Sequence, residues 1–232
     1  MDGSSKMRVV VEPVKEGPRG GSGTPTRKER ALATRRRMME AASREFSRRG
    51  YARTTVDAVA ALAGVAVQTV YFAFHTKAEL LQAAYEHAVL GPEPVPPHLS
   101  GWWRAAEATP DVTTALRHVV DGNIEVFERA APLVWAVHGD EDARPTYEIN
   151  EGLRRDGAEM MMSILVVKHD LRPGLTDRQG RDIMLTILGP LTFAMLTQEL
   201  GWTSEEYGSW AKQALGREIF GVADETSSSS PG

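Results

Sequence analysis

The chain has 232 residues, of which 42% are hydrophobic and 25% are charged, and these are ordinary values for a globular protein. It contains no cysteine, which excludes disulfides, thiolate nucleophiles and cysteine-ligated zinc or iron–sulfur sites. The net charge of −4 hides an asymmetry, because residues 1–82 hold 15 basic and 8 acidic residues, whereas the remainder holds 12 and 23. A polyanion would therefore be attracted to the first part and repelled by the second.

The two ends of the chain lack the patterns of targeting or structured segments. No apolar run approaches the ~20 residues that span a bilayer, and the N-terminus lacks the apolar stretch of a signal peptide. We therefore expect a soluble, cytoplasmic protein. Residues 1–26 carry scattered glycines and prolines without helical or strand periodicity, which predicts a disordered basic arm. The serine-rich residues 224–232 predict a disordered tail.

Between these ends the sequence predicts an all-α fold, because chain breakers separate helix-periodic stretches and no segment alternates like a strand. The first predicted helix, 34–49, carries Met38, Ala42 and Phe46 on one face and ends at Gly50. The remaining helices are predicted, in chain order, at 55–63, 67–74, from about 76 onward, 111–129, 132–137, 145–167, 177–200 and 204–220. Pro190 is expected to kink or break the helix 177–200.

Residues 55–74 have the pattern of a helix-turn-helix. Ala60 and Ala63 let two short helices approach closely, and Gly64 permits the turn between them because it adopts positive φ without a Cβ penalty. The second helix of such a motif stands out from the body and enters a major groove about 12 Å wide. The positions that its outer face would expose are Val67, Gln68, Thr69, Phe72 and His75.

Two stretches carry a resemblance to the DNA-binding domain of the tetracycline-repressor (TetR) family. The first is Thr54-Thr55-Val56-x-x-Val59-Ala60-x-x-Ala63-Gly64-Val65, followed by Val70-Tyr71-x-x-Phe74-x-x-Lys77-x-x-Leu80. The second, similar to the family's first helix, is Met38-Met39-x-Ala41-Ala42-x-x-x-Phe46-x-x-x-Gly50-Tyr51. The resemblance covers about residues 34–82, and Gly201-Trp202-Thr203-Ser204-Glu205-Glu206-Tyr207 resembles a junction before the family's last helix. It implies a helix-turn-helix DNA-binding domain at 27–82 and a helical ligand-binding and dimerisation domain at 83–223.

The resemblance also implies which residues contact DNA. Base edges would be contacted from the recognition helix, and phosphates from the helix start, the helix end and the basic residues before the motif. The implied DNA contacts are Arg35, Arg36, Arg37, Thr54, Thr55, Val67, Gln68, Thr69, Tyr71, Phe72, His75 and Lys77. The alternatives are a half-buried core ring for Tyr71 and a solvated cation for Lys77. The sequence departs from the family at Ala66, where Ser or Thr often caps the recognition helix, and at Phe72 and His75, which are frequently His and a turn residue.

The second domain is expected to bind a small molecule and to dimerise. Its helix near 177–200 is apolar nearly all round, which indicates burial on both sides and suits a two-fold four-helix interface. The residues predicted at that interface are Met184, Ile187, Leu188, Leu191, Met195, Tyr207, Trp210 and Ala214. Aromatic and methionine side chains with a few polar groups suit an adaptable apolar pocket, although ordinary helix-bundle core is an equally good reading of any one of them. The candidate ligand-binding residues are Trp102, Trp103, Asn123, Phe127, Trp135, His138, Tyr147, Met160, Met161 and Ile164.

No pattern indicates catalysis or metal binding. The six histidines are widely separated, and no G-x-S-x-G nucleophile elbow occurs, so we expect no enzyme, no metal and no cofactor. The resulting hypothesis is a ligand-responsive transcriptional repressor that binds a palindromic operator as a homodimer and is released by a small molecule of apolar or aromatic character. The alternative is a helical enzyme or carrier for an apolar metabolite in which the basic N-terminal part is incidental.

Overall fold

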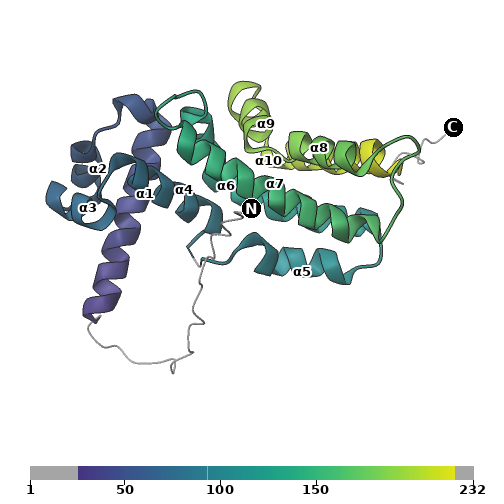
Figure 1. Ribbon diagram of the computed structural model, residues 1–232, viewed down its shortest axis with the longest axis horizontal. Helices are drawn as coiled ribbons and strands as arrows, with labels where there is room; N and C mark the ends of the chain where they lie inside the picture. The colour runs from purple at the N-terminus through teal and green to yellow at the C-terminus, as the bar shows by residue number, and fades with distance from the viewer. Residues whose placement is uncertain (1–25, 93, 223–232) are drawn as a thin grey trace, which may run out of the picture.

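The computed structural model describes residues 26–92 and 94–222, and within these ranges it consists of helices without any strand (Figure 1). The prediction of an all-α fold is confirmed. The helices are α1 (Arg27–Arg53), α2 (Val56–Ala63), α3 (Val67–Phe74), α4 (Lys77–Leu90), α5 (Gly101–Ala108), α6 (Val112–Val137), α7 (Arg144–Val166), α8 (Asp177–Ile187), α9 (Pro190–Ala194) and α10 (Ser204–Leu215). A short 3₁₀ turn precedes α5 at Pro97–Leu99, and π-helical turns follow α9 at Met195–Glu199 and α10 at Gly216–Phe220. The predicted disordered arm and tail lie outside the described residues, except for Thr26.

Helix α1 begins seven residues before the predicted start at 34, so that prediction is wrong. Thr26 caps the helix, because its hydroxyl accepts a hydrogen bond from the Glu29 N–H at 3.2 Å while the Glu29 carboxylate accepts one from the Thr26 N–H at 2.7 Å. This capping box satisfies two of the amide groups that a helix start leaves unpaired. Gly50, at φ 76°, interrupts the regular helical geometry near the end of α1. The helix then makes one more turn and ends at Arg53, with Thr54 as its C-cap.

The structure corrects two further helix predictions and agrees with a third. Helix α5 was not predicted; the Ser100 hydroxyl caps it by accepting from the Trp103 N–H at 3.3 Å, and Trp103 is buried in the core. Helix α6 runs through Pro132 rather than breaking there, because the residues after the proline are buried and hold the last turns in place. The predicted helix 177–200 is divided at Leu188 and Gly189, as Pro190 at the first position of α9 led us to expect.

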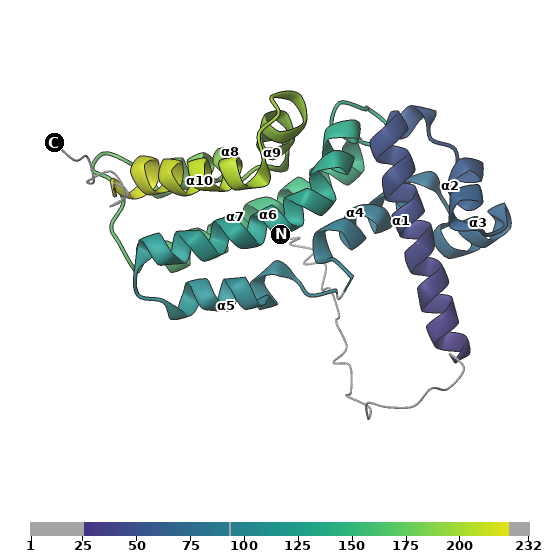
Figure 2. The ribbon, with the colours of Figure 1, turned by 180° about the vertical axis from the view of Figure 1, so that it is seen from behind.

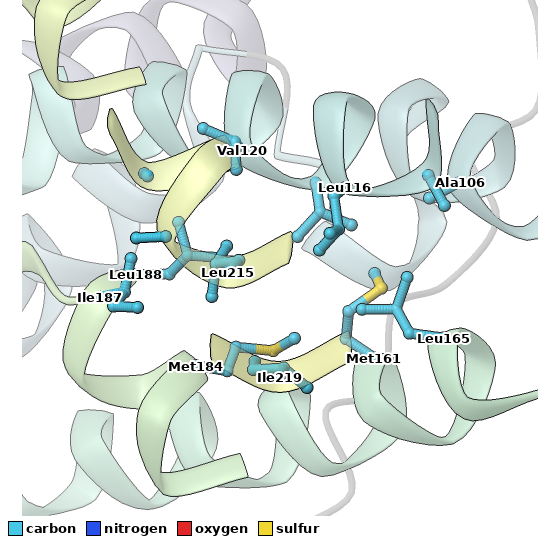
Figure 3. Close-up of a cluster of buried hydrophobic side chains, with 14 of the residues drawn as sticks. Ala106, Leu116, Val120, Met161, Leu165, Met184, Ile187, Leu188, Leu215 and Ile219 are labelled. Carbon is cyan, nitrogen blue, oxygen red and sulfur yellow. The ribbon is translucent and has the colours of Figure 1, made fainter. Parts of the chain in front are cut away.

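Two hydrophobic cores organise the molecule. We call α1–α4 the head and α5–α10 the body. The body core joins all six body helices, and the part shown in Figure 3 contains Ala106, Leu116, Val120, Met161, Leu165, Met184, Ile187, Leu188, Leu215 and Ile219. The head core gathers apolar residues of α1–α4, and it also includes Leu133, Val134 and Val137 from the end of α6 and Ala143 just beyond it. The head is therefore packed against the body rather than joined to it by a flexible linker.

Hydrogen bonds between head and body reinforce this packing. The Arg129 guanidinium of α6 donates to the Ala88 carbonyl near the end of α4 at 3.0 Å. The Asp140 carboxylate, between α6 and α7, accepts from the Ala52 N–H near the end of α1 at 3.0 Å. Figures 1 and 2 show the head at one end of the elongated body, with α6 reaching into it from both points of view. A shift of α6 would consequently be felt at both α1 and α4.

Candidate nucleic-acid interface

Helices α2 and α3 form a compact pair whose axes meet at 107°, within the range of a helix-turn-helix. The Thr55 hydroxyl caps α2 by accepting from the Ala58 N–H at 3.2 Å. Gly64 closes the helix in the left-handed conformation, at φ 66° and ψ 43°, which only glycine adopts without strain.

No single described helix is long and apolar enough to cross a membrane; the α2–α3 pair meets that test by length and composition only.

Helix α3 turns one side to the head core and the other to solvent. Val70 and Phe74 are buried, whereas Gln68 and Thr69 are exposed. Tyr71 is 48% exposed and Phe72 is 88% exposed, which is a large apolar ring to leave in water. Val67 is only half-buried, so of the predicted base-contacting residues Gln68 and Thr69 lie in the open. Both ribbon views place α3 at the outer end of the head, far from the body (Figures 1 and 2).

The two ends of α3 carry the features that set it apart from the family pattern. Ala66 precedes the helix without a side-chain cap, as its residue type predicted. His75 follows it at φ 49°, the one described non-glycine residue with positive φ. Thr76 then caps α4 by accepting from the Glu79 N–H at 3.0 Å. The start of α3 therefore has no side-chain cap, and its end passes through a residue with positive φ directly into the capped start of α4.

The two threonines before α2 have different surroundings. Thr55 is exposed, and its hydroxyl lies at the N-terminus of α2, where a phosphate would also meet the positive end of the helix dipole. Thr54 is only 2% exposed, and its hydroxyl donates to the carbonyls of Glu45 at 3.0 Å and Gly50 at 2.8 Å. The Thr54 side chain therefore ties the end of α1 together and is not available to DNA, which corrects its predicted role.

The three arginines predicted to contact DNA also differ. Arg35 is held by α3: its Nη1 lies 2.9 Å from the Ala73 carbonyl oxygen, and its guanidinium carbon lies 4.3 Å from the centre of the Phe74 ring. Arg36 pairs with Glu40 at 3.6 Å, and Arg37 donates to the Thr34 hydroxyl at 3.4 Å. All three residues are exposed. The bonds of Arg36 and Arg37 join residues of α1 only, whereas the bond of Arg35 joins α1 to α3.

The basic arm before Arg35 was expected to add DNA contacts only as a whole, and no residue at the start of α1 was named, because the helix was expected to begin at residue 34. The spacing Thr26-x-x-Glu29 is the capping-box pattern and could have revealed the earlier start. Arg27, Lys28 and Arg30 thus lie on a folded helix that is continuous with the head.

Lys77, at the start of α4, is partly buried between head and body. Its ammonium lies 4.2 Å from the centre of the Tyr51 ring and 3.4 Å from the Ala52 carbonyl oxygen. Burial lowers the pKa of Lys77, and the nearby carboxylates of Asp140 and Asp142 oppose that shift. Lys77 is therefore neither a freely solvated cation nor a side chain standing out toward a phosphate.

The candidate ligand-binding residues do not surround one cavity in this structure. Trp103, Phe127 and Met161 are buried in the body core, and Tyr147 packs against the head core instead. Trp102, Trp135 and Ile164 pack at the edge of the body core, and Asn123 is half-buried there. His138 and Met160 are exposed. None of the candidate residues lines the open groove of about 400 Å³ along α8, which is formed by Leu175, Gln179, Asp182, Ile183, Thr186 and Ile187.

Most residues predicted at the dimer interface lie inside the protomer. Met184, Ile187, Leu188, Tyr207 and Ala214 are buried in the body core. Leu191 and Trp210 are half-buried, and Met195 is 51% exposed. These three, rather than the other five, have side-chain surface to offer a partner. Helical periodicity shows that a face is apolar, but it does not distinguish the inside of a protomer from the surface of a dimer.

The described residues contain no cluster of three or more His, Asp or Glu side chains that could hold a metal ion. The features gathered on the outer face of the head, namely an exposed α3, a capped α2 and basic residues on α1, are those of a nucleic-acid interface. They are supplied by α1, α2 and α3, whose inner faces contribute to one core.

Comparison with known sequences agrees with this geometry. The family described as "Bacterial regulatory proteins, tetR family" matches residues 38–84. Two transcriptional regulators of Pseudomonas putida, the HTH-type regulator TtgR and the probable HTH-type regulator ArpR, are each 52% identical to this chain over 56 residues. Each alignment covers 24% of this chain and 27% of the relative. The similarity to these relatives is thus confined to about a quarter of their length.

Solved structures resemble the chain over most of its length. The regulator FadR from Bacillus subtilis, in complex with stearoyl-CoA, has a TM-score of 0.63 at 13% identity and covers 81% of this chain and 98% of its own. NalD of Pseudomonas aeruginosa, the secondary repressor of the MexAB-OprM multidrug efflux pump, has a TM-score of 0.60 at 20% identity, with coverages of 82% and 98%. A TetR-like regulator from Rhodococcus sp. RHA1 has a TM-score of 0.61 at 16% identity, with coverages of 84% and 97%. At these identities the likeness establishes the fold of head and body together.

Proposed function

We propose that this chain is a ligand-responsive repressor of the TetR family that binds a palindromic DNA operator as a homodimer. The observation that carries the proposal is the outer face of α3, where Gln68, Thr69, Tyr71 and Phe72 are exposed on a helix that stands clear of the body. Hydrogen-bonding and apolar groups side by side on such a helix suit the edges of base pairs in a major groove. A protein that acts on DNA in a bacterium would work in the cytoplasm.

The alternative of a helical enzyme or carrier is not retained. The family matched by the head, and the relatives that share it, are transcriptional regulators. The net positive charge of residues 1–82 then has a use, because it offsets the repulsion between DNA and an acidic body.

Release by a small molecule is supported by the way the body holds the head. Arg129 bonds the end of α4 and Asp140 bonds the end of α1, so a ligand that prefers another position of α6 would move both attachments. The ligand's differential affinity for the two shapes limits how far it can shift the protein toward release. The methionines and aromatic rings of the body core favour an apolar or aromatic effector, and the stearoyl-CoA bound by the FadR neighbour is compatible with that class.

Dimerisation is proposed through the outer faces of α8–α10, where Met195 is exposed, Leu191 and Trp210 are half-buried, and an open groove runs along α8. A two-fold dimer would place two α3 helices about one turn of DNA apart, near 34–36 Å. The exposed Thr186 lines the groove, so Thr186→Arg should give a monomer in analytical ultracentrifugation and weaken operator binding. Ser163→Arg, on an exposed position of α7, is the matched control and should leave the dimer intact.

The DNA-binding proposal is tested by selecting genomic fragments with the purified full-length protein. Recovery of one palindromic sequence is expected, and Gln68→Ala should weaken its binding by about 1–3 kcal/mol while relaxing the preference at one position in each half-site. Gln213→Ala, on an exposed position of α10, is the control. Failure to retain any sequence above bulk DNA would overturn the proposal. Once the operator is known, release by metabolites can be screened directly on it.

A further inference from the structure

The first three turns of α1 project from the molecule. Every residue from 27 to 37 is exposed except Thr34, which is half-buried, and we call this segment the basic extension. Both ribbon views show the start of α1 running past α2–α4 and away from the body, with no other helix beside it (Figures 1 and 2). It lies outside residues 38–84, which match the family. No residue of this segment belongs to the head core, which begins at Met38.

The basic extension contacts the end of α3. Its last turn is fixed to the end of α3, because Arg35 bonds the Ala73 carbonyl at 2.9 Å and covers the Phe74 ring. From Arg35 the helix continues for eight residues toward its start at Arg27, which is about 12 Å at the usual rise per residue. The extension thus begins beside the proposed DNA-contacting surface and reaches beyond it.

Its charge is strongly positive. Six arginines and lysines face one acidic residue, Glu29, whose carboxylate is engaged in the capping box. Arg27, Lys28 and Arg30 make no ion pair or side-chain hydrogen bond with any residue in 26–92 or 94–222. Positive charge in the first turn also opposes the helix dipole, which costs stability until an anion is near. An anionic partner would remove that cost and meet three cations at once.

The composition points to a phosphate backbone rather than to a protein or a lipid surface. Leu32 is the only large apolar side chain of the extension, so the helix has no apolar face to bury in a groove or a bilayer. Arginine and lysine are the main donors to DNA phosphates, and such contacts are independent of base sequence.

We propose that the basic extension is a second DNA-binding element, which holds phosphates flanking the site read by α3 through Arg27, Lys28 and Arg30. This inference rests on the proposed function, and it adds an interaction outside the family-matched domain. The extension raises affinity and lengthens the footprint, and it leaves the base preference to α3.

The test compares the salt dependence of DNA binding in two triple variants of the full chain. Arg27→Gln/Lys28→Gln/Arg30→Gln removes the three charges and keeps good helix formers. Arg104→Gln/Arg117→Gln/Arg155→Gln removes three exposed charges from the body. Binding is measured by fluorescence anisotropy on the selected operator duplex and on a random duplex of the same length, over a several-fold range of salt concentration, with circular dichroism as the check of helix content.

The slope of log K against log salt should become shallower by about 0.9 for each phosphate that is no longer neutralised, or by roughly 5 for three phosphates in each half of a dimer. The preference for operator over random DNA should remain, the hydroxyl-radical footprint should shorten at both edges, and the body variant should behave as the original chain. Arg27→Lys/Arg30→Lys keeps the charges and should keep the slope. An unchanged slope in the extension variant, with the original chain binding its operator normally, overturns this inference alone. An original chain that binds no DNA overturns the proposed function and this inference together.

Discussion

The guanidinium of Arg35 on α1 donates to the carbonyl oxygen of Ala73, the second-last residue of α3, across 2.9 Å. The same guanidinium covers the ring of Phe74 at 4.3 Å. The next residue, His75, has a positive φ of 49°, so the chain leaves α3 in a backbone conformation that residues other than glycine rarely adopt. Arg35 thus holds the end of the recognition helix where the backbone is least relaxed.

From this arrangement we expect Arg35 to position α3 rather than to contact a phosphate. Arg35→Lys should weaken operator binding by about 1 kcal/mol, or roughly fivefold, because lysine keeps the charge but loses the planar group that stacks and bonds together. The salt slope of operator binding should stay unchanged in this variant. Both quantities can be measured by anisotropy titrations at several salt concentrations.

Arg44→Lys is the matched control, since Arg44 is exposed on the same helix half a turn away from the α3 side. It should leave operator affinity unchanged. If Arg35→Lys bound as tightly as the original chain while Arg35→Gln lowered the salt slope by about one, Arg35 would be a phosphate contact after all.

A glycine in α6 sets the distance between α6 and α5. A Cβ at Gly122 would lie 2.2 Å from the Trp102 indole, so the two helices approach closely only because that atom is missing. Gly122→Ala should therefore destabilise the body by about 1–3 kcal/mol through overpacking. Thermal unfolding should show a midpoint lower by several degrees.

Gly157→Ala provides the opposite case. Nothing lies within 4 Å of a Cβ at Gly157 in α7, so alanine should be neutral or stabilising by up to about 1 kcal/mol. Equal effects of the two substitutions would show that helix propensity, and not the contact with Trp102, determines the result.

These cases show what the sequence could predict and where it fell short. The α2–α3 pair was located accurately, because Thr55, Gly64 and the alternating small and apolar residues act locally. Helix α5 was missed since its eight residues are held by the burial of Trp103 and Ala106, which depends on α6 and has no local signature. Thr54 was assigned to DNA because the motif gives residue types, whereas its two internal hydrogen bonds depend on how the end of α1 folds. The apolar residues of α8 and α10 were assigned to a partner for the same reason, as periodicity does not show which neighbour covers them.

A buried tyrosine predicts how stability depends on alkaline pH. The Tyr207 hydroxyl donates to the Ile187 carbonyl at 2.7 Å, and burial raises the pKa of Tyr207 far above its ordinary value near 10. A raised folded-state pKa means that the stabilisation is complete below about pH 10 and is lost as pH rises above it. Each such group should lower the free energy of unfolding by up to about 1.4 kcal/mol per pH unit there. Urea titrations at a series of pH values from neutral to strongly alkaline would measure this slope.

Tyr85, whose pKa is also raised by burial, should contribute in the same direction, so one substitution removes only part of the slope. Tyr207→Phe should cost about 1 kcal/mol near neutral pH by leaving the Ile187 carbonyl unpaired, and it should flatten the alkaline decline. An alkaline slope identical to that of the original chain would mean that Tyr207 does not stay protonated inside the fold.

A charged pair from α7 contacts the chain at the break between α8 and α9. Arg154 contacts the nearly buried Glu151 through two bonds of 2.9 and 2.7 Å, and its remaining Nη1 donates to the carbonyls of Leu185 at 2.9 Å and Leu188 at 3.3 Å. Those carbonyls lie at the end of α8, where Pro190 supplies no N–H to continue the helix.

Arg154→Met should destabilise the protein by about 2–3 kcal/mol, because it leaves a buried carboxylate without its partner and the helix end without a donor. Chemical denaturation would measure the loss, and Glu151→Gln/Arg154→Met should recover part of it by removing the stranded charge. Arg181→Met breaks the more exposed pair with Glu159 and should cost less than about 1 kcal/mol. If the Arg154 and Arg181 variants lost the same stability, the pair at Glu151 would be no more than a surface salt bridge, and the break before α9 would be maintained by Pro190 and the surrounding core alone.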